Sequence, residues 1–155
     1  SQWEYYARNR GDDVIYPWGN DEPTCDLAVI DVEGQTTGCG TGYTWDVCSK
    51  PAGNTEQGLC DMAGNVHEWT GDYYHFGYAW DYEDETYYAP DDGTYWREPA
   101  NISEEGLHWM VLRGGGVNSN LVFMNRMRLL HTTDFAYSGL GIRCVREPFV
   151  PLDDD

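Results

Sequence analysis

The stretch at residues 58–69, GLCDMAGNVHEW, constrains the fold of this chain more than any other feature of the sequence. Its acidic residues, Asp61 and Glu68, stand on either side of the pair Gly64-Asn65. A Gly-Asn pair favours a turn, because both residues tolerate backbone angles that other residues avoid. The stretch therefore predicts a tight turn that carries two carboxylates. Such a turn is a cation-binding loop, a catalytic site or only a packed corner.

Turns and short segments dominate the rest of the sequence, which contains 18 Gly and 7 Pro in 155 residues. A short helix is predicted over residues 1–9, where apolar residues recur at helical spacing. Strands are predicted at 109–117, where an apolar run ends in glycines, and at 140–146, where residue types alternate. We expect one domain over residues 1–150 and a loose acidic tail at 151–155.

The net charge of −18 comes from 9 basic and 27 acidic residues. It excludes nucleic acid as a partner, because a polyanion would be repelled. No apolar run approaches the roughly 20 residues of a membrane-spanning helix, so we expect no membrane span. The first residues lack the regions of a signal peptide and resemble the interior of a helix. We therefore expect that a segment upstream of residue 1 is missing from this chain.

The five cysteines do not have the spacing of a zinc site, so disulfides and an oxidising compartment are the better interpretation. Two bonds and one unpaired cysteine allow five choices of the unpaired residue, each with three pairings of the rest. We expect local pairing, Cys25 with Cys39 and Cys48 with Cys60, each bond contributing roughly 2–3 kcal/mol. Cys144 is then either free and buried or bonded to something outside this chain.

Residues 72–98 combine 10 aromatic with 8 acidic residues. Tyrosine and tryptophan have rigid apolar rings with polar tips, which suits a recognition surface. The alternative is that most of these rings fill the core of their own loop. The surface would meet a protein, a glycan or a second copy of the chain. Its candidate residues are Tyr78, Trp80, Tyr82, Tyr87, Tyr88 and Trp96.

Five motifs occur in order along the chain: WEY at 3–5, YPWGN at 16–20, the 58–69 stretch, LRGGG at 112–116 and GIRCVR at 141–146. Together they resemble the formylglycine-generating enzyme family, also called the sulfatase-modifying factor family. The resemblance implies an α+β, C-type-lectin-like fold with little regular secondary structure, short antiparallel strands and long ordered loops. It also implies that the partner of Cys144 is a cysteine in the missing N-terminal segment.

The resemblance further implies a calcium ion in the 58–69 stretch. Calcium prefers six to eight oxygen ligands, and a loop offers carbonyls that no strand uses. The implied ligands are the side chains of Asp61 and Glu68 and the carbonyls of Gly64 and Val66. The alternative is a metal-free turn packed by its own apolar residues.

Several neighbouring residues carry weaker expectations. Asn65 is expected to cap the local backbone of the turn, and His67 to be a partly exposed packing residue. The family's second calcium site is expected to be lost, because Val29 stands where the family has asparagine. Asp26 and Asp31 remain as candidate ligands that would rescue that second site.

The family's oxidase binds copper(I) through two cysteines that follow the Arg-Gly-Gly turn, since this ion requires soft thiolates. The matching residues here are Ser119 and Met124, so we expect no oxidase activity. We expect a secreted or cell-surface, non-catalytic binding or assembly module stabilised by calcium and disulfides. The alternative is an enzyme of a divergent branch of the family, with metal-dependent oxidation or sulfur chemistry.

Overall fold

The computed structural model describes residues 2–32, 37–75, 79–80, 87–88, 94–96, 108–120 and 129–145. Within these residues regular structure is sparse, as the glycine and proline content predicts. The helices are α1 (Gln2–Ala7) and a 3-10 turn at Pro51–Gly53. The strands are β1 (His67–Tyr73), β2 (Ala79–Trp80), β3 (Tyr87–Tyr88), β4 (Trp109–Arg113), β5 (Leu129–Thr132) and β6 (Leu140–Ile142).

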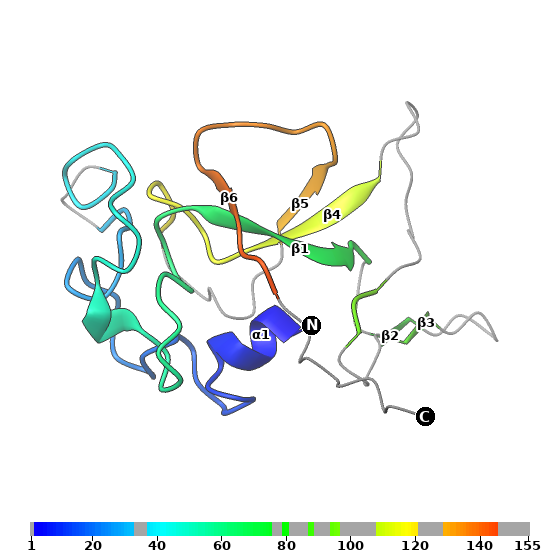
Figure 1. Ribbon diagram of the computed structural model, residues 1–155, viewed down its shortest axis with the longest axis horizontal. Helices are drawn as coiled ribbons and strands as arrows, with labels where there is room; N and C mark the ends of the chain where they lie inside the picture. Colours follow the sequence, from blue (N-terminus) through cyan, green and yellow to red (C-terminus); the bar gives the residue numbers. More distant parts are fainter. Residues whose placement is uncertain are drawn as a thin grey trace, which may run out of the picture.

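The central sheet has the strand order β5-β4-β1-β6, and β2 and β3 form a separate antiparallel pair (Figure 1). β4 is antiparallel to both of its neighbours, whereas β6 runs parallel to β1. Glu68 in β1 is opposite Arg113 in β4, and the register between β1 and β4 shifts between Trp69 and Tyr73. Short antiparallel strands are thus confirmed, with one parallel pair that the sequence did not predict.

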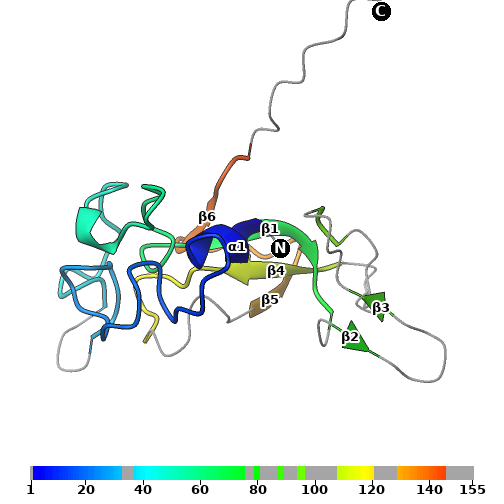
Figure 2. The same cartoon turned by 90° about the horizontal axis from the view of Figure 1, so that it is seen from below.

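The α1 helix lies beside the sheet at the end formed by β1 and β6 (Figure 1, Figure 2). Ala7 is its fully buried residue, whereas Tyr5 and Tyr6 remain about half exposed. A guanidinium nitrogen of Arg113 lies 2.7 Å from a carboxylate oxygen of Glu4 in this helix. The Arg113 side chain is 1% exposed and that of Glu4 15%, so a buried ion pair joins α1 to the sheet.

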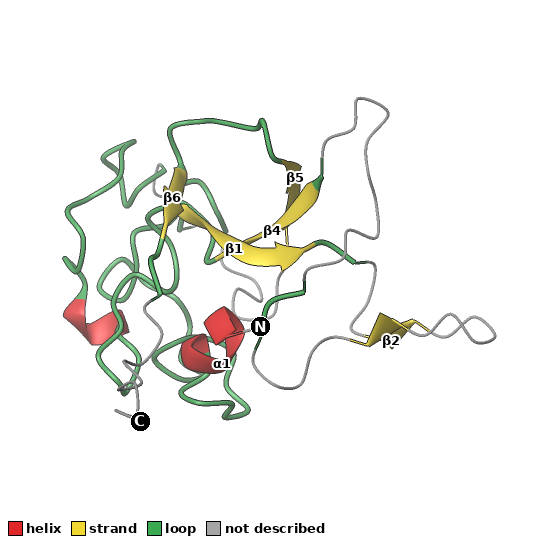
Figure 3. Ribbon diagram, turned by 45° about the vertical axis from the view of Figure 1, so that its right-hand side comes forward, coloured by secondary structure: helices red, strands yellow, loops and turns green. Residues whose placement is uncertain are grey.

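Most of the described residues between 9 and 66 form loops on one side of the sheet (Figure 1, Figure 3). Their core consists of buried Tyr16, Ala28, Ile30 and Ala63. The Tyr16 ring stacks on that of Trp18, with 5.0 Å between ring centroids. Backbone hydrogen bonds between loops that are distant in sequence replace the ladder of a sheet, for example from the Gly38 N–H to the Val117 carbonyl. The long loops are therefore ordered by packing and cross-loop hydrogen bonds.

None of the described helices has the length and apolar character needed to cross a bilayer.

Candidate functional site

The turn at residues 61–66 is locked by close backbone packing. Its three left-handed residues are Asp61, Gly64 and Asn65, with φ of 52°, 79° and 63°. The Gly64 N–H donates to the Gly114 carbonyl at 2.8 Å, and the Asn65 N–H donates to the Val29 carbonyl at 2.8 Å. A Cβ at Gly64 would lie 2.6 Å from the Val29 oxygen, so glycine is required here for space as well as for φ.

Asn65 connects this turn to a loop far away in sequence. Its Oδ1 accepts the Trp45 N–H at 3.0 Å, and its Nδ2 donates to the Trp45 carbonyl at 3.1 Å. The expectation that Asn65 caps its own turn is therefore wrong. The side-chain amide carries a donor and an acceptor side by side, and it bonds both the N–H and the carbonyl of Trp45. A residue of a neighbouring antiparallel strand would make the same two bonds.

Asp61 binds the same loop at Cys48, three residues after Trp45. One carboxylate oxygen accepts the Cys48 N–H at 2.6 Å, and Cys48 is bonded to Cys60, the residue before Asp61. The sulfurs of Cys48 and Cys60 and an Asp61 oxygen lie within 4.8 Å of one another, a grouping of three potential metal ligands in the described part of the chain. Both sulfurs are used in the disulfide, so Asp61 alone of this group is available to a metal ion.

Glu68 is surrounded differently, because its carboxylate is buried and receives three hydrogen bonds. Arg143 donates from Nε to Oε2 at 3.0 Å and from one terminal nitrogen to Oε1 at 2.7 Å. The Trp3 indole N–H donates to Oε2 at 2.7 Å. The side chain of Glu68 is 5% exposed and that of Arg143 27%. A bidentate pair of this kind is among the strongest polar contacts in proteins.

The four predicted calcium ligands therefore differ in availability. Asp61 has one oxygen in use, and the Gly64 carbonyl accepts the Val66 N–H at 2.8 Å. Among the described residues, no donor contacts the Val66 carbonyl. Both oxygens of Glu68 are taken by donors, two of them on a cationic side chain. The full ligand set thus does not fit a calcium ion while the Arg143 pair is formed.

The residues considered for a second calcium site differ in their surroundings. Asp26 is exposed, and Asp31 is half-buried and donates its N–H to the Ser119 carbonyl at 3.2 Å. Val29 is 1% exposed, and its carbonyl accepts the Asn65 N–H. In the described residues Asp26 and Asp31 belong to no group of three potential ligands, and the loss of the second site stays a prediction.

Ser119, at the first position of the family's copper pair, has a structural role. Its hydroxyl oxygen accepts the Gly116 N–H at 3.0 Å, and its own N–H donates to the Gly116 carbonyl at 2.9 Å. Met124 lies outside the described residues. The hydroxyl therefore closes the turn that follows β4.

His67, next to Glu68 in β1, is buried, so the expectation of a partly exposed residue is wrong. It is 7% exposed, and its Nδ1 lies 2.6 Å from the Tyr137 hydroxyl oxygen. Burial lowers the pKa of the His67 imidazole below its usual 6.5, and His131 lowers it further. The pKa of Tyr137 is raised by burial. Burial therefore favours the neutral forms of both rings, and the tautomer of the imidazole determines which of the two donates the hydrogen bond.

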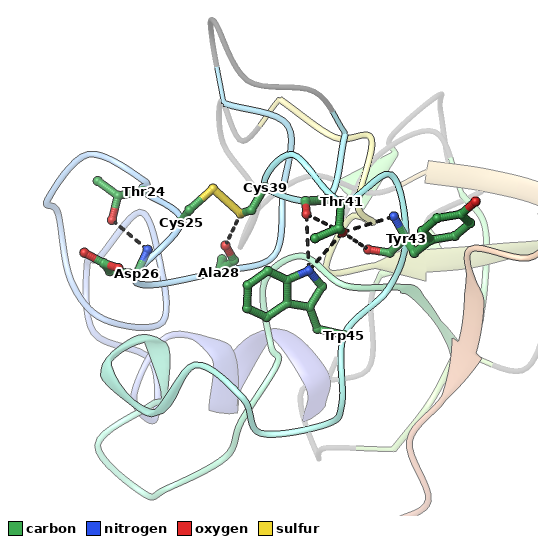
Figure 4. Close-up of a disulfide and its surroundings, with 9 residues drawn as sticks. Thr24, Cys25, Asp26, Ala28, Cys39, Thr41, Tyr43 and Trp45 are labelled. Atoms are coloured by element: carbon green, nitrogen blue, oxygen red, sulfur yellow. Dashed lines mark hydrogen bonds between the residues drawn. A yellow bond between two sulfur atoms is a disulfide. The ribbon is translucent and has the colours of Figure 1, made fainter.

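Both predicted disulfides are confirmed. Cys25 is bonded to Cys39 and Cys48 to Cys60, with Cα–Cα distances of 5.6 Å and 5.1 Å. Figure 4 shows the first bond beside the loop of Thr41, Tyr43 and Trp45. Cys144 is free within the described residues and exposed, which removes the alternative of a buried free cysteine.

The predicted aromatic surface falls largely outside the described side chains. Trp96 is 8% exposed and stacks on His75 with 3.6 Å between ring centroids, so it was wrongly predicted to lie on the surface. A large ring buries more apolar area by stacking than by facing water. The backbone of Trp80, Tyr87 and Tyr88 forms β2 and β3, but their side chains and all of Tyr78 and Tyr82 lie outside the described part.

Exposed apolar side chains occur instead on a loop that sequence reasoning missed. Tyr43 is 77% exposed and Val47 81% exposed. They flank Trp45, whose backbone is held by Asn65 and whose indole N–H donates to the Gly38 carbonyl and to the Thr41 hydroxyl (Figure 4). We call residues 41–48 the braced loop. The signal available in the sequence was the alternation of apolar residues at 43, 45 and 47.

Comparison with known proteins agrees with this description. A sequence model of the family described as "Sulfatase-modifying factor enzyme 1-like domain" matches residues 1–148. A search of curated proteins gave no match.

Solved structures with a similar fold include two at low sequence identity. "Crystal Structure of CarF" is 22% identical, with a TM-score of 0.58, over 90% of this chain and 42% of that one. "Treponema denticola variable protein 1" is 23% identical, with a TM-score of 0.62, over 90% of this chain and 43% of that one. The chain therefore spans less than half the length of either protein, and the likeness concerns the fold.

Proposed function

Since the chain belongs to the sulfatase-modifying factor enzyme 1-like family, we propose that it is a non-catalytic member that acts as an extracytoplasmic binding or assembly module. The observation that carries the proposal is the role of Ser119. A hydroxyl that accepts the Gly116 N–H at 3.0 Å supports a turn and offers no thiolate. Methionine at 124 supplies at most a thioether, and copper(I) in a redox site requires softer anionic sulfur.

The proposed binding surface is the braced loop. Tyr43 and Val47 are exposed, and the backbone between them is fixed by Asn65, Asp61 and the Cys48–Cys60 bond. A loop held in one conformation before binding loses little entropy on binding, which favours affinity. A surface tyrosine with an aliphatic neighbour suits contact with a protein.

The partner proposed for this surface is a protein of positive net charge. The chain carries a net charge of −18, so its potential attracts cationic partners and opposes contact between two copies. Two disulfides are compatible with such a partner in an oxidising, extracytoplasmic environment. Calcium is not part of the proposed function, because Glu68 is committed to Arg143 and Trp3.

The alternative remains an enzyme of a divergent branch, and one observation favours it. The His67–Tyr137 pair lies against the glycine turn that leads to Ser119, because a Cβ at Gly116 would be 2.9 Å from His67 Nδ1. A neutral imidazole with a bonded phenol is a combination that can transfer protons. The alternative therefore predicts chemistry near this turn, with a metal ion supplied from outside.

Copper(I) binding separates the two proposals. We would titrate the disulfide-intact chain with copper(I) against a competing chelator, without oxygen, and then supply oxygen and a cysteine-containing peptide. The expected result is no stoichiometric copper and no oxidation of the peptide. The matched variant Ser119→Cys/Met124→Cys should gain tight copper(I) binding. Stoichiometric copper in the wild-type chain, with turnover of the peptide, would establish the enzyme instead.

The surface is tested by capturing partners from the extracytoplasmic proteins of the source cells. We expect a cationic protein to bind the wild-type chain and the control Ile142→Ser, which replaces a side chain that is 76% exposed on β6. The variant Tyr43→Ser/Val47→Ser should lose the partner. High salt should weaken binding, because charge attraction is screened. A partner retained by the loop variant would exclude this surface, and dimers in sedimentation would point to a second copy.

A further inference from the structure

We propose that the Arg143 guanidinium is the resident cation of the 60–68 turn and takes the place that a divalent metal ion would fill. It neutralises the carboxylate of Glu68 and also contacts the backbone of the turn. The turn is therefore held by an ion that the chain supplies from the residue after β6. Removing this side chain should convert a metal-independent turn into one that responds to calcium.

The first step rests on how completely Arg143 satisfies Glu68. Both carboxylate oxygens receive an Arg143 N–H, at 3.0 Å and 2.7 Å, and Trp3 adds a third donor at 2.7 Å. Glu68 is 5% exposed, so water competes little for its oxygens. A buried carboxylate needs a positive partner, because burial without one costs several kcal/mol.

The second step concerns the backbone. The same terminal nitrogen that binds Glu68 Oε1 also donates to the Cys60 carbonyl at 2.8 Å. Arg143 thus joins a carboxylate at one end of the turn to a backbone carbonyl at the other. These are the two oxygen types that a bound calcium ion takes from a loop.

The third step is electrostatic exclusion. A guanidinium keeps its charge at any physiological pH. A calcium ion on Glu68 would therefore lie within a few ångströms of a permanent positive charge. At that distance, and with little water between them, repulsion opposes a second cation strongly. The Glu68 carboxylate can therefore bind either Arg143 or a calcium ion, but not both at once.

The experiment measures the unfolding temperature of the disulfide-intact chain in excess calcium and in chelator. Wild type should show the same temperature in both. Arg143→Met should be destabilised in chelator and should recover by about 5 °C or more in millimolar calcium, because a ligand that binds only the native state raises this temperature. Arg143→Met/Glu68→Gln should lose the calcium response. Arg143→Lys, which keeps a cation, should remain indifferent to calcium.

Two outcomes overturn the inference. One is a wild-type chain whose unfolding temperature falls on chelation and recovers with calcium, because the turn then needs a metal ion despite Arg143. The other is a folded Arg143→Met chain that ignores calcium. If Arg143→Met folds only when calcium is present, the inference is supported. If Arg143→Met does not fold at all, the other two chains decide. The inference then stands only if the unfolding temperatures of wild type and Arg143→Lys are the same in calcium and in chelator.

Discussion

The two acids of the 58–69 stretch lie seven positions apart in sequence, yet they have opposite roles. Asp61 is half-buried at the edge of the turn and accepts one neutral backbone N–H, from Cys48. Glu68 lies inside the sheet and is paired with Arg143. The difference comes from which parts of the chain contact each carboxylate. A neighbouring loop passes Asp61, whereas Trp3 of α1 and Arg143, the residue after β6, both reach Glu68. A shared motif therefore does not imply a shared ligand.

The largest expected effect comes from Glu68→Gln. The new amide presents an N–H toward the donors of Arg143, so a half-buried cation loses its partner. We expect a loss of roughly 3–4 kcal/mol of unfolding free energy, toward the lower end for a broken buried pair because Arg143 keeps some contact with water. Urea unfolding measures it. A loss no larger than that of Asp61→Asn would erase the difference between the two acids.

Next in size is removal of the disulfide beside Asp61. Cys48→Ser/Cys60→Ser opens a loop of sequence separation 12, and we expect a loss of about 2–3 kcal/mol. The matched control is Cys25→Ser/Cys39→Ser, with sequence separation 14. The first variant should couple to Asp61→Asn, because Asp61 binds the Cys48 N–H. The control should add to Asp61→Asn independently. If a double-mutant cycle gave the same coupling energy between Asp61→Asn and either pair of cysteine substitutions, this placement of Asp61 would be contradicted.

Asp61→Asn itself should cost little. The asparagine oxygen can still accept the Cys48 N–H, so only the added strength of a charged acceptor is lost, about 1 kcal/mol. Urea unfolding beside Glu68→Gln gives the comparison. A loss of several kcal/mol would show that the Asp61 carboxylate has a charged partner, such as a metal ion.

The smallest effect is the pH dependence of His67, which points to the opposite face of β1 from Glu68 because strand side chains alternate. Burial and His131 lower the pKa of His67 in the folded chain below 6.5. The unfolded chain therefore binds the proton first, so this contribution is complete above pH 6.5 and is lost as the pH falls through the lower folded pKa. His67→Phe should flatten the loss of stability below pH 6.5, measured by urea unfolding. An unchanged pH profile would mean that His67 does not titrate in this range.

Local sequence signals predicted the short helix, both disulfides, and strands at 109–117 and 140–146, of which β4 and β6 form the first residues. These features depend on residues that are near in sequence, whereas the fold class was implied by the resemblance of five ordered motifs to a known family. The partners of the charged side chains were not predicted, because Arg143 and Glu68 are 75 positions apart and Arg113 and Glu4 are 109 apart. One signal was available, since Arg113 ends an apolar strand and a buried arginine requires an acid. No local pattern says which acid it is.

The clamp that Asn65 forms on Trp45 has a consequence for cooperativity. The braced loop displays Tyr43 and Val47 to solvent, yet its backbone is bonded to a turn that packs on Val29 and Gly114. The loop cannot open by itself without breaking contacts of that turn. Its amides should therefore exchange with solvent only when the turn unfolds. An exposed surface then belongs to the same unfolding unit as the buried residues of that turn.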